Sequence, residues 1–321
     1  MRILITGAAG FIGSHLAESL ADRGHTVIGL DGLTPYHDRS RKYANLTCLE
    51  EQGIEVVRRD LVTDALGPVL RGVEAVYHLA GQPGLSADTD RDVFVRNNVY
   101  ATERLLRALA DHSSLNAFLF ASSSSVYGTN AIGPEAAPLR PASIYGRTKR
   151  RAEAVVRAHA QSAAWDACIF RLFSVYGPRE RPDKLIPTAI RCARTRTAFP
   201  LYAGSEAHER SFTYVGDAVA GMAAALPHWA RCAGETINLG TPTTASTPEV
   251  LDAVAKAVGR PLCIRRAPAR PGDQRRTRAR IDKARRLLNF EPATSLREGL
   301  AAEVAWMRSP EGSAPRAKKI V

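Results

Sequence analysis

Tyr145 and Lys149 stand four residues apart in a stretch that is expected to open a helix. At this spacing two side chains share one face of a helix. A tyrosine with its ordinary pKa of about 10 is a weak base, but a nearby lysine cation would lower that pKa. The serine run 122–125 follows an apolar stretch and can supply a third group that orients a substrate hydroxyl. The three residue types favour proton removal from a hydroxyl, although Tyr-x-x-x-Lys alone can occur on any helix.

Three glycines, Gly7, Gly10 and Gly13, lie between an apolar run at 3–5 and a stretch at 14–23 with helical apolar spacing. A strand-to-helix turn of this kind needs glycine for its bend and for close approach to a pyrophosphate. Asp31 directly follows the second apolar run, where an acid binds the ribose hydroxyls of adenosine and disfavours a 2′-phosphate. The pattern predicts NAD, whose nicotinamide ring would add positive charge beside Tyr145. The alternative is a glycine turn in a ligand-free α/β domain.

The elements that must position these groups alternate in type. Apolar runs at 54–57, 75–79, 117–120 and 168–172 are typical of strands, and helical stretches such as 93–111 separate them. This alternation predicts an α/β fold with a Rossmann-type doubly wound parallel sheet over residues 1–172. Asp60 follows the third strand and could accept from the adenine amino group or cap a helix. His78 lies inside an apolar run and is expected to be structural.

The alternation breaks after residue 173, which predicts a smaller C-terminal substrate-binding lobe over residues 173–321. Short strands at 213–215 and 236–239 are expected to return to the main sheet. The basic stretch 262–321 is expected to be irregular, apart from a helix near 281–288. Residues 310–321 are expected to form a mobile tail.

Composition excludes several classes of protein. The 321 residues carry a formal net charge of +12, but no zinc-finger or RNA-binding aromatic motif accompanies the arginines, so an anionic nucleotide ligand is favoured over nucleic acid. No run of about 18 apolar residues occurs, so no membrane span is expected. The five cysteines are scattered, and the chain begins at once with a strand. These features predict a cytoplasmic protein without disulfides, a metal site or a signal peptide.

Taken together, the motifs are specific enough to suggest a family. The Gly-x-x-Gly-x-x-Gly spacing resembles that of short-chain dehydrogenases/reductases. Over essentially its whole length the chain resembles the extended branch, the NAD-dependent nucleotide-sugar epimerase/dehydratase family. The matching segments are 6–13, 31–33, 60–61, 78–80, 98–99, 122–128, 145–149, 175–178, 210–215 and 270–273.

The resemblance implies a role for each matched residue. Tyr145 would be the catalytic base and acid, Lys149 its partner and Ser123 the hydroxyl that orients the substrate. Residues implied in NAD binding are Gly7, Gly10, Phe11, Ile12, Gly13, Asp31, Asp60, Leu61, Leu79, Ala80, Gln82, Asn98, Tyr145 and Lys149. Residues implied in binding the nucleotide sugar are Ser123, Ser124, Ser174, Arg210, Arg270, Asp273 and Thr277, with both arginines on the diphosphate.

Two activities fit the resemblance, and both begin with transient oxidation at sugar C4. The first is a UDP-sugar 4-epimerase, of which the serine run most resembles the uronate and hexosamine types. The second is a redox-neutral UDP-N-acetylglucosamine 5,6-dehydratase, as in tunicamycin-type antibiotic biosynthesis. Ser124 and Ser125 stand where common 4,6-dehydratases carry Asp-Glu, which argues against that reaction. A small residue at Thr277 would admit an N-acetyl group.

A third hypothesis is a non-catalytic NAD(H)-binding regulator, against which the retained Tyr145 and Lys149 argue. Relatives also imply a homodimer, with the helices at 93–111 and 145–160 pairing with their copies. Some positions depart from the family pattern. Ser174 replaces a usual asparagine, and residues 82–85 lack an expected arginine.

Overall fold

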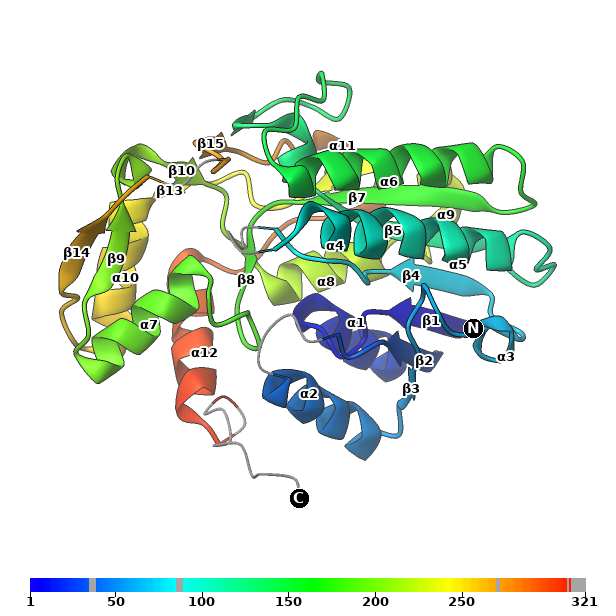
Figure 1. Ribbon diagram of the computed structural model, residues 1–321, viewed down its shortest axis with the longest axis horizontal. Helices are drawn as coiled ribbons and strands as arrows, with labels where there is room; N and C mark the ends of the chain where they lie inside the picture. Colours follow the sequence, from blue (N-terminus) through cyan, green and yellow to red (C-terminus); the bar gives the residue numbers. More distant parts are fainter. Residues whose placement is uncertain (35–38, 85–88, 270–271, 311, 313–321) are drawn as a thin grey trace.

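The computed structural model describes residues 1–34, 39–84, 89–269, 272–310 and 312 of the chain. Within this part the central sheet has seven parallel strands in the order β3-β2-β1-β4-β5-β7-β12 (Figure 1). The bounds are β1 (Arg2–Thr6), β2 (Thr26–Asp31), β3 (Glu55–Arg58), β4 (Ala75–His78), β5 (Ala117–Ser123), β7 (Asp166–Leu172) and β12 (Thr236–Leu239). The order reverses direction at β1 and β4, so the predicted doubly wound Rossmann-type sheet is confirmed.

Helices cover both faces of this sheet because its strands are apolar on both sides. Alternate residues of β1 point to opposite faces, with Ile3 and Ile5 in one core and Leu4 in the other. The first core contains residues of α1 (Phe11–Asp22), α2 (Ser40–Glu51), α8 (Val215–Ala223), α9 (Trp229–Cys232) and α11 (Asp282–Leu288). The second contains residues of α3 (Gly67–Leu70), α5 (Ala101–Leu109) and α6 (Ile144–Ala160).

The helix expected at 93–111 is interrupted by a wider turn. It comprises α4 (Arg91–Val95), the π-helical segment η1 (Arg96–Tyr100) and α5. A π turn inserts an extra residue and rotates the side chains that follow it, and such turns often lie at functional sites. Both Asn97 and Asn98 lie in this turn, and of the two only Asn97 lines the cleft described below.

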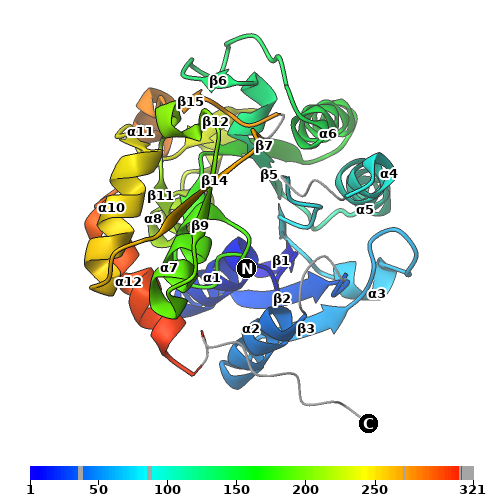
Figure 2. The same ribbon diagram turned by 60° about the vertical axis from the view of Figure 1, so that its left-hand side comes forward.

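The smaller lobe is more regular than the sequence suggested. Figure 2 shows α7 (Leu185–Thr195), α10 (Thr247–Val258) and α12 (Leu296–Arg308) packed side by side, next to the strand pair β9 (Phe199–Tyr202) and β14 (Ile264–Ala267). Ser246 and Ser295 open α10 and α12 with capping boxes, in which Glu249 and Glu298 reach back to the cap. The expectation of an irregular stretch after residue 262 was therefore wrong. Most of the expected tail lies outside the described residues.

Two short sheets link the lobes. The strand expected at 213–215 does not join the main sheet, because β11 (Thr213–Tyr214) pairs with β8 (Val175–Tyr176) instead. The strand expected at 236–239 is β12, which pairs with β7 as predicted. A second small sheet runs in the order β13-β10-β15-β6. Its strands are β13 (Ala245–Ser246), β10 (Glu209–Arg210), β15 (Arg276–Thr277) and β6 (Asn130–Ala131).

Candidate active site

The glycine turn joins β1 to α1 at the carboxyl edge of the sheet. Gly7 has a φ of +75°, and a Cβ added there would lie 2.8 Å from the amide nitrogen of Ala80. A Cβ at Gly13 would lie 2.1 Å from the carbonyl oxygen of Gly7. Gly10 caps α1 without a side-chain hydrogen bond, which leaves the first amides of the helix available to a phosphate.

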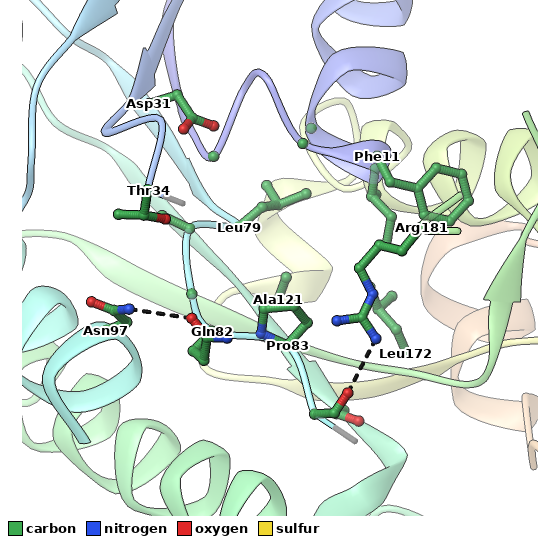
Figure 3. Close-up of a pocket in the computed structure, with 18 of the residues that line it drawn as sticks. Phe11, Asp31, Thr34, Leu79, Gln82, Pro83, Asn97, Ala121, Leu172 and Arg181 are labelled. Carbon is green, nitrogen blue, oxygen red and sulfur yellow. Dashed lines mark hydrogen bonds between the residues drawn. The ribbon is translucent and has the colours of Figure 1, made fainter. Parts of the chain in front are cut away.

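Asp31 is buried at the end of β2, beside this turn. Its Oδ2 accepts from the amide of Ala9 at 3.1 Å, and its Oδ1 accepts from the amide of Leu33 at 2.8 Å. The ammonium group of Lys42 lies 2.9 Å from Oδ1. Figure 3 shows Asp31 near Thr34 at one end of the cleft, with Arg181 on the other side. The glycine cradle and this anchored carboxylate fit the adenosine diphosphate half of a dinucleotide.

A cleft of about 420 Å³ runs along the carboxyl ends of the strands from Asp31 to the serine run. The residues predicted to bind cofactor line it, apart from Asn98. They are Gly7, Gly10, Phe11, Ile12, Gly13, Asp31, Asp60, Leu61, Leu79, Ala80, Gln82, Tyr145 and Lys149. Among the described residues there is no cluster of three or more His, Cys, Asp or Glu that could hold a metal ion.

Asp60 is held as a carboxylate at the wall of the cleft. Its Oδ1 accepts from the amide of Val62 at 2.7 Å, and its Oδ2 lies 2.9 Å from Nη2 of Arg96. Burial acts to raise the pKa of Asp60, but these hydrogen bonds and the Arg96 charge outweigh it and hold that pKa below its usual value. The side chain is therefore an acceptor at neutral pH, as contact with an amino group requires.

Asn98 does not reach the cleft, contrary to expectation. Its side-chain oxygen accepts from the amide of Gln82 at 2.7 Å, and its amide group donates to the carbonyl of Gln82 and to Thr148. The π turn brings Asn97 to the cleft instead, where it donates to Gln82 Oε1 at 3.3 Å (Figure 3). Asn98 thus positions the loop after β4 rather than lining the cavity.

The predicted catalytic residues lie together on one wall. The Ser143 hydroxyl accepts from the amide of Gly146 and so starts α6 at Ile144. Tyr145 is thereby in the first turn of α6, and its hydroxyl is hydrogen-bonded to Ser123 at the end of β5. Lys149, one turn later, donates to the carbonyl of Ala121 at 2.8 Å. Strand β5 and helix α6 therefore bring the three groups to the same part of the cleft.

The electrostatics of these groups differ from the expectation. Burial raises the pKa of Tyr145, while the hydrogen bond with Ser123 and the positive charge of Arg181 act in the opposite direction. Burial also lowers the pKa of Lys149 to about 8, although the nearby Glu153 carboxylate raises it. Arg181 is therefore a cation acting on Tyr145 that the sequence analysis did not include.

The substrate half of the cleft adjoins a second cavity of about 370 Å³. Ser174, Arg181, Lys184 and Arg210 line both cavities where they meet. Asp273 lines the second cavity alone. Sequence reasoning missed Arg181 and Lys184, although the five charged residues that follow the Val-Tyr-Gly-Pro motif were a usable signal.

Thr277 and Arg270 are the two remaining residues that were predicted to bind the substrate. Thr277 is 0% exposed on β15, and its hydroxyl accepts from the amide of Ser211. Thr277 lines neither of the two cavities, and its role in admitting an N-acetyl group stays a prediction. Gln274 lies at the cleft instead and accepts from the Ser124 hydroxyl at 3.4 Å. Arg270 lies outside the described residues.

Comparison with known proteins decides the family. The model of the NAD dependent epimerase/dehydratase family matches residues 3–240. The chain belongs to this family. It is 38% identical to the uncharacterized UDP-glucose epimerase YtcB of Bacillus subtilis, over 96% of this chain and 98% of that protein.

Solved structures of this family include both reaction types. The UDP-glucuronic acid 4-epimerase of Bacillus cereus, in complex with UDP-glucuronic acid and NAD, superposes with a TM-score of 0.91 and 34% identity, covering 96% of this chain and 99% of that one. A dTDP-glucose 4,6-dehydratase of Streptomyces venezuelae, with NAD bound, gives a TM-score of 0.89 and 31% identity, covering 98% and 99%. The chain is thus an NAD-dependent enzyme of the epimerase/dehydratase family.

Proposed function

We propose that this enzyme is a UDP-sugar 4-epimerase. The observation that carries the proposal is the composition of the wall around Tyr145. Ser123, Ser124 and Ser125 line the cleft there, and no carboxylate occupies the two positions after Ser123. Hydroxyl groups can orient a sugar, but they do not supply the acid that expels a C6 oxygen in the common 4,6-dehydration.

In the proposed mechanism, Tyr145 removes the proton from the C4 hydroxyl while Ser123 holds that hydroxyl in place. Bound NAD would supply the acceptor and donor for the C4 hydride. Arg210, which donates to the carbonyl of Gln274 at 2.9 Å, would hold the diphosphate while the 4-keto sugar presents its other face. Tyr145 then returns its proton to the new hydroxyl, so no atom is lost.

The charges of the cleft favour an acidic sugar. Arg181 acts electrostatically on Tyr145 and therefore lies near the place of the reacting sugar. A guanidinium group is suited to bind a carboxylate. Arg181 lines both cavities where they meet, whereas Thr277 lines neither, so we infer that UDP-glucuronate is the preferred substrate.

The test is incubation of the NAD-loaded enzyme with UDP-glucuronate, UDP-glucose and UDP-N-acetylglucosamine, followed by mass spectrometry and NMR. We expect a C4 epimer of unchanged mass, most rapidly from UDP-glucuronate. Loss of one water from any substrate would contradict the epimerase, and loss from UDP-N-acetylglucosamine would favour the 5,6-dehydratase. Tyr145→Phe is the control, because it removes the base and leaves the fold intact.

We further propose a cytoplasmic homodimer. Helices α5 and α6 lie side by side on the outer surface of the sheet (Figures 1 and 2). Val93 on α4 and Tyr100 on η1, the two segments that precede α5, are 38% and 49% exposed, which supports burial against a second copy. Light scattering should give twice the chain mass, and a monomer at micromolar concentration would contradict the proposal.

A further inference from the structure

Residues 177–184 form a strap that lines one side of the cofactor cleft. The strap begins after β8 and ends at Lys184, the N-cap of α7. Arg179, Glu180, Arg181 and Pro182 line the same cleft as the glycine turn. The strap belongs in sequence to the smaller lobe, yet its side chains reach across to the Rossmann domain.

Arg179 makes two contacts with helix α1 of the Rossmann domain. Its Nη2 lies 2.8 Å from Oε1 of Glu18, and its Nη1 donates to the hydroxyl of Ser14 at 3.2 Å. Both partners are on α1, the helix whose N-terminus faces the dinucleotide phosphates. The two charged side chains are 16% and 17% exposed, so water screens this pair less than a surface pair.

Two further contacts anchor the strap on other sides of the cleft. Arg181 donates to the carbonyl of Gly84 at 3.1 Å, and Figure 3 shows its side chain extending past Phe11 toward that loop. Arg41 on α2 donates to the carbonyl of Glu180. The ring of Trp306 on α12 stacks on Arg41, with its centroid 5.3 Å from Cζ. The strap is thus held from α1, from α2 and from the loop after β4.

The backbone of this region is held in unfavourable conformations. Ser174 has a φ of 24° and Arg179 a φ of 71°, a region that residues with a Cβ rarely adopt. Gly177, with a φ of 134°, supplies the conformational freedom between them. Such a conformation persists only where surrounding contacts hold it. At Arg179 those contacts are the ones made by its own side chain to α1.

We propose that Arg179 is a cofactor-retaining residue, whose ion pair with Glu18 fastens the strap over the bound dinucleotide. In a reaction that returns its hydride, the cofactor has no need to leave between turnovers. A fastened strap would slow its escape without taking part in the chemistry. The inference rests on NAD binding and holds whichever sugar product the enzyme forms.

The experiment measures how fast bound NAD⁺ exchanges with isotopically labelled NAD⁺ in the folded holoenzyme. We expect Arg179→Ala and Glu18→Gln each to raise the dissociation rate about tenfold, the effect of one modest ionic interaction. Arg179→Lys keeps the charge and should restore part of the retention. The double variant should release NAD⁺ no faster than Arg179→Ala, because Arg179→Ala alone already removes the ion pair with Glu18.

The matched control is Arg285→Ala. It removes an arginine–glutamate pair of similar length, to Glu291 at 2.6 Å, on the exposed surface away from the cleft. Its dissociation rate should equal that of the unmodified enzyme. If Arg179→Ala and Glu18→Gln are folded and exchange NAD⁺ no faster than this control, the proposal is overturned. The proposal would also be overturned if these variants lost the same thermal stability with and without NAD⁺ while their NAD⁺ exchange rate stayed unchanged. The ion pair would then serve only to hold the two lobes together.

Discussion

Arg171 binds both carboxylate oxygens of Glu153 in the interior of the protein. Its Nε lies 3.0 Å from Oε1 and its Nη2 lies 2.8 Å from Oε2, and Glu153 is 0% exposed. Ser122 also donates to Oε1 at 2.6 Å. Glu153 lies one turn after Lys149 on α6, while Ser122 precedes Ser123 on β5. This network therefore fixes the catalytic helix against the strand that carries the serine run.

Replacing Glu153 should destabilise the fold and disturb catalysis together. Glu153→Gln leaves the buried Arg171 guanidinium without a counter-charge, and we expect a loss of about 3–5 kcal/mol in the free energy of unfolding. It also removes the carboxylate that raises the pKa of Lys149, so that pKa should fall further. Urea denaturation and the pH–rate profile measure the two effects. Arg107→Ala, which breaks an exposed pair with Glu103, should cost at most about 0.5 kcal/mol.

Adding one methyl group at Gly13 should abolish cofactor binding. The new Cβ would lie 2.1 Å from the Gly7 carbonyl, so the turn must open and the amides of α1 would move away from the phosphates. We expect purified Gly13→Ala to contain less than a tenth of the NAD of the unmodified enzyme. Gly67→Ala, whose Cβ would meet nothing within 4 Å, should retain its NAD. A fully loaded Gly13→Ala would show that the turn is not the phosphate site.

Glu180 should make stability decrease as pH rises. Burial raises its folded pKa from 4.5 to about 8, against the opposing charges of Lys184, Arg181 and Arg41, while Asp183 adds to the increase. The folded state therefore binds more protons than the unfolded state between these values. The contribution of Glu180 to the free energy of unfolding is complete below pH 4.5 and is lost as pH rises through 8. The free energy of unfolding should fall by at most about 1.4 kcal/mol per pH unit over this range.

Glu180→Gln should flatten this dependence. The measurement is the free energy of unfolding between pH 5 and 8 for both proteins, with Glu206→Gln as the control, because Glu206 is a half-buried glutamate on the same lobe whose pKa is lowered instead of raised. Parallel curves for Glu180→Gln and the unmodified enzyme would mean that Glu180 does not hold its proton in the folded state.

Arg181 should discriminate between sugars. If its guanidinium binds a sugar carboxylate, Arg181→Ala should raise KM for UDP-glucuronate about tenfold or more and change KM for UDP-glucose little. Steady-state kinetics with the two substrates measure the ratio. Equal changes for both sugars would place Arg181 on the part of the ligand they share. Lys184→Ala is a useful comparison, because Lys184 lies where the two cavities meet.

Much of the cofactor half could be predicted from the sequence because its determinants are local. Apolar periodicity predicts which segments are strands and helices. The glycine turn follows from steric contacts within a few residues, and Asp31 follows directly from the end of β2. The four-residue spacing of Tyr145 and Lys149 likewise predicted that both lie on one helix face. Ser123 was expected beside them because it follows directly on the strand β5.

The substrate half depended on contacts between distant segments. Thr277 is buried because β15 pairs with β10 and β6, which are far from it in sequence. Asn98 lies in a π-helical segment that no residue pattern revealed, and its side chain bonds to Gln82 and Thr148 instead of lining the cleft. Arg181 reaches the cleft because the strap crosses to the Rossmann domain. Only the tertiary structure could decide these placements, since each is set by packing between segments rather than by the residues next to it.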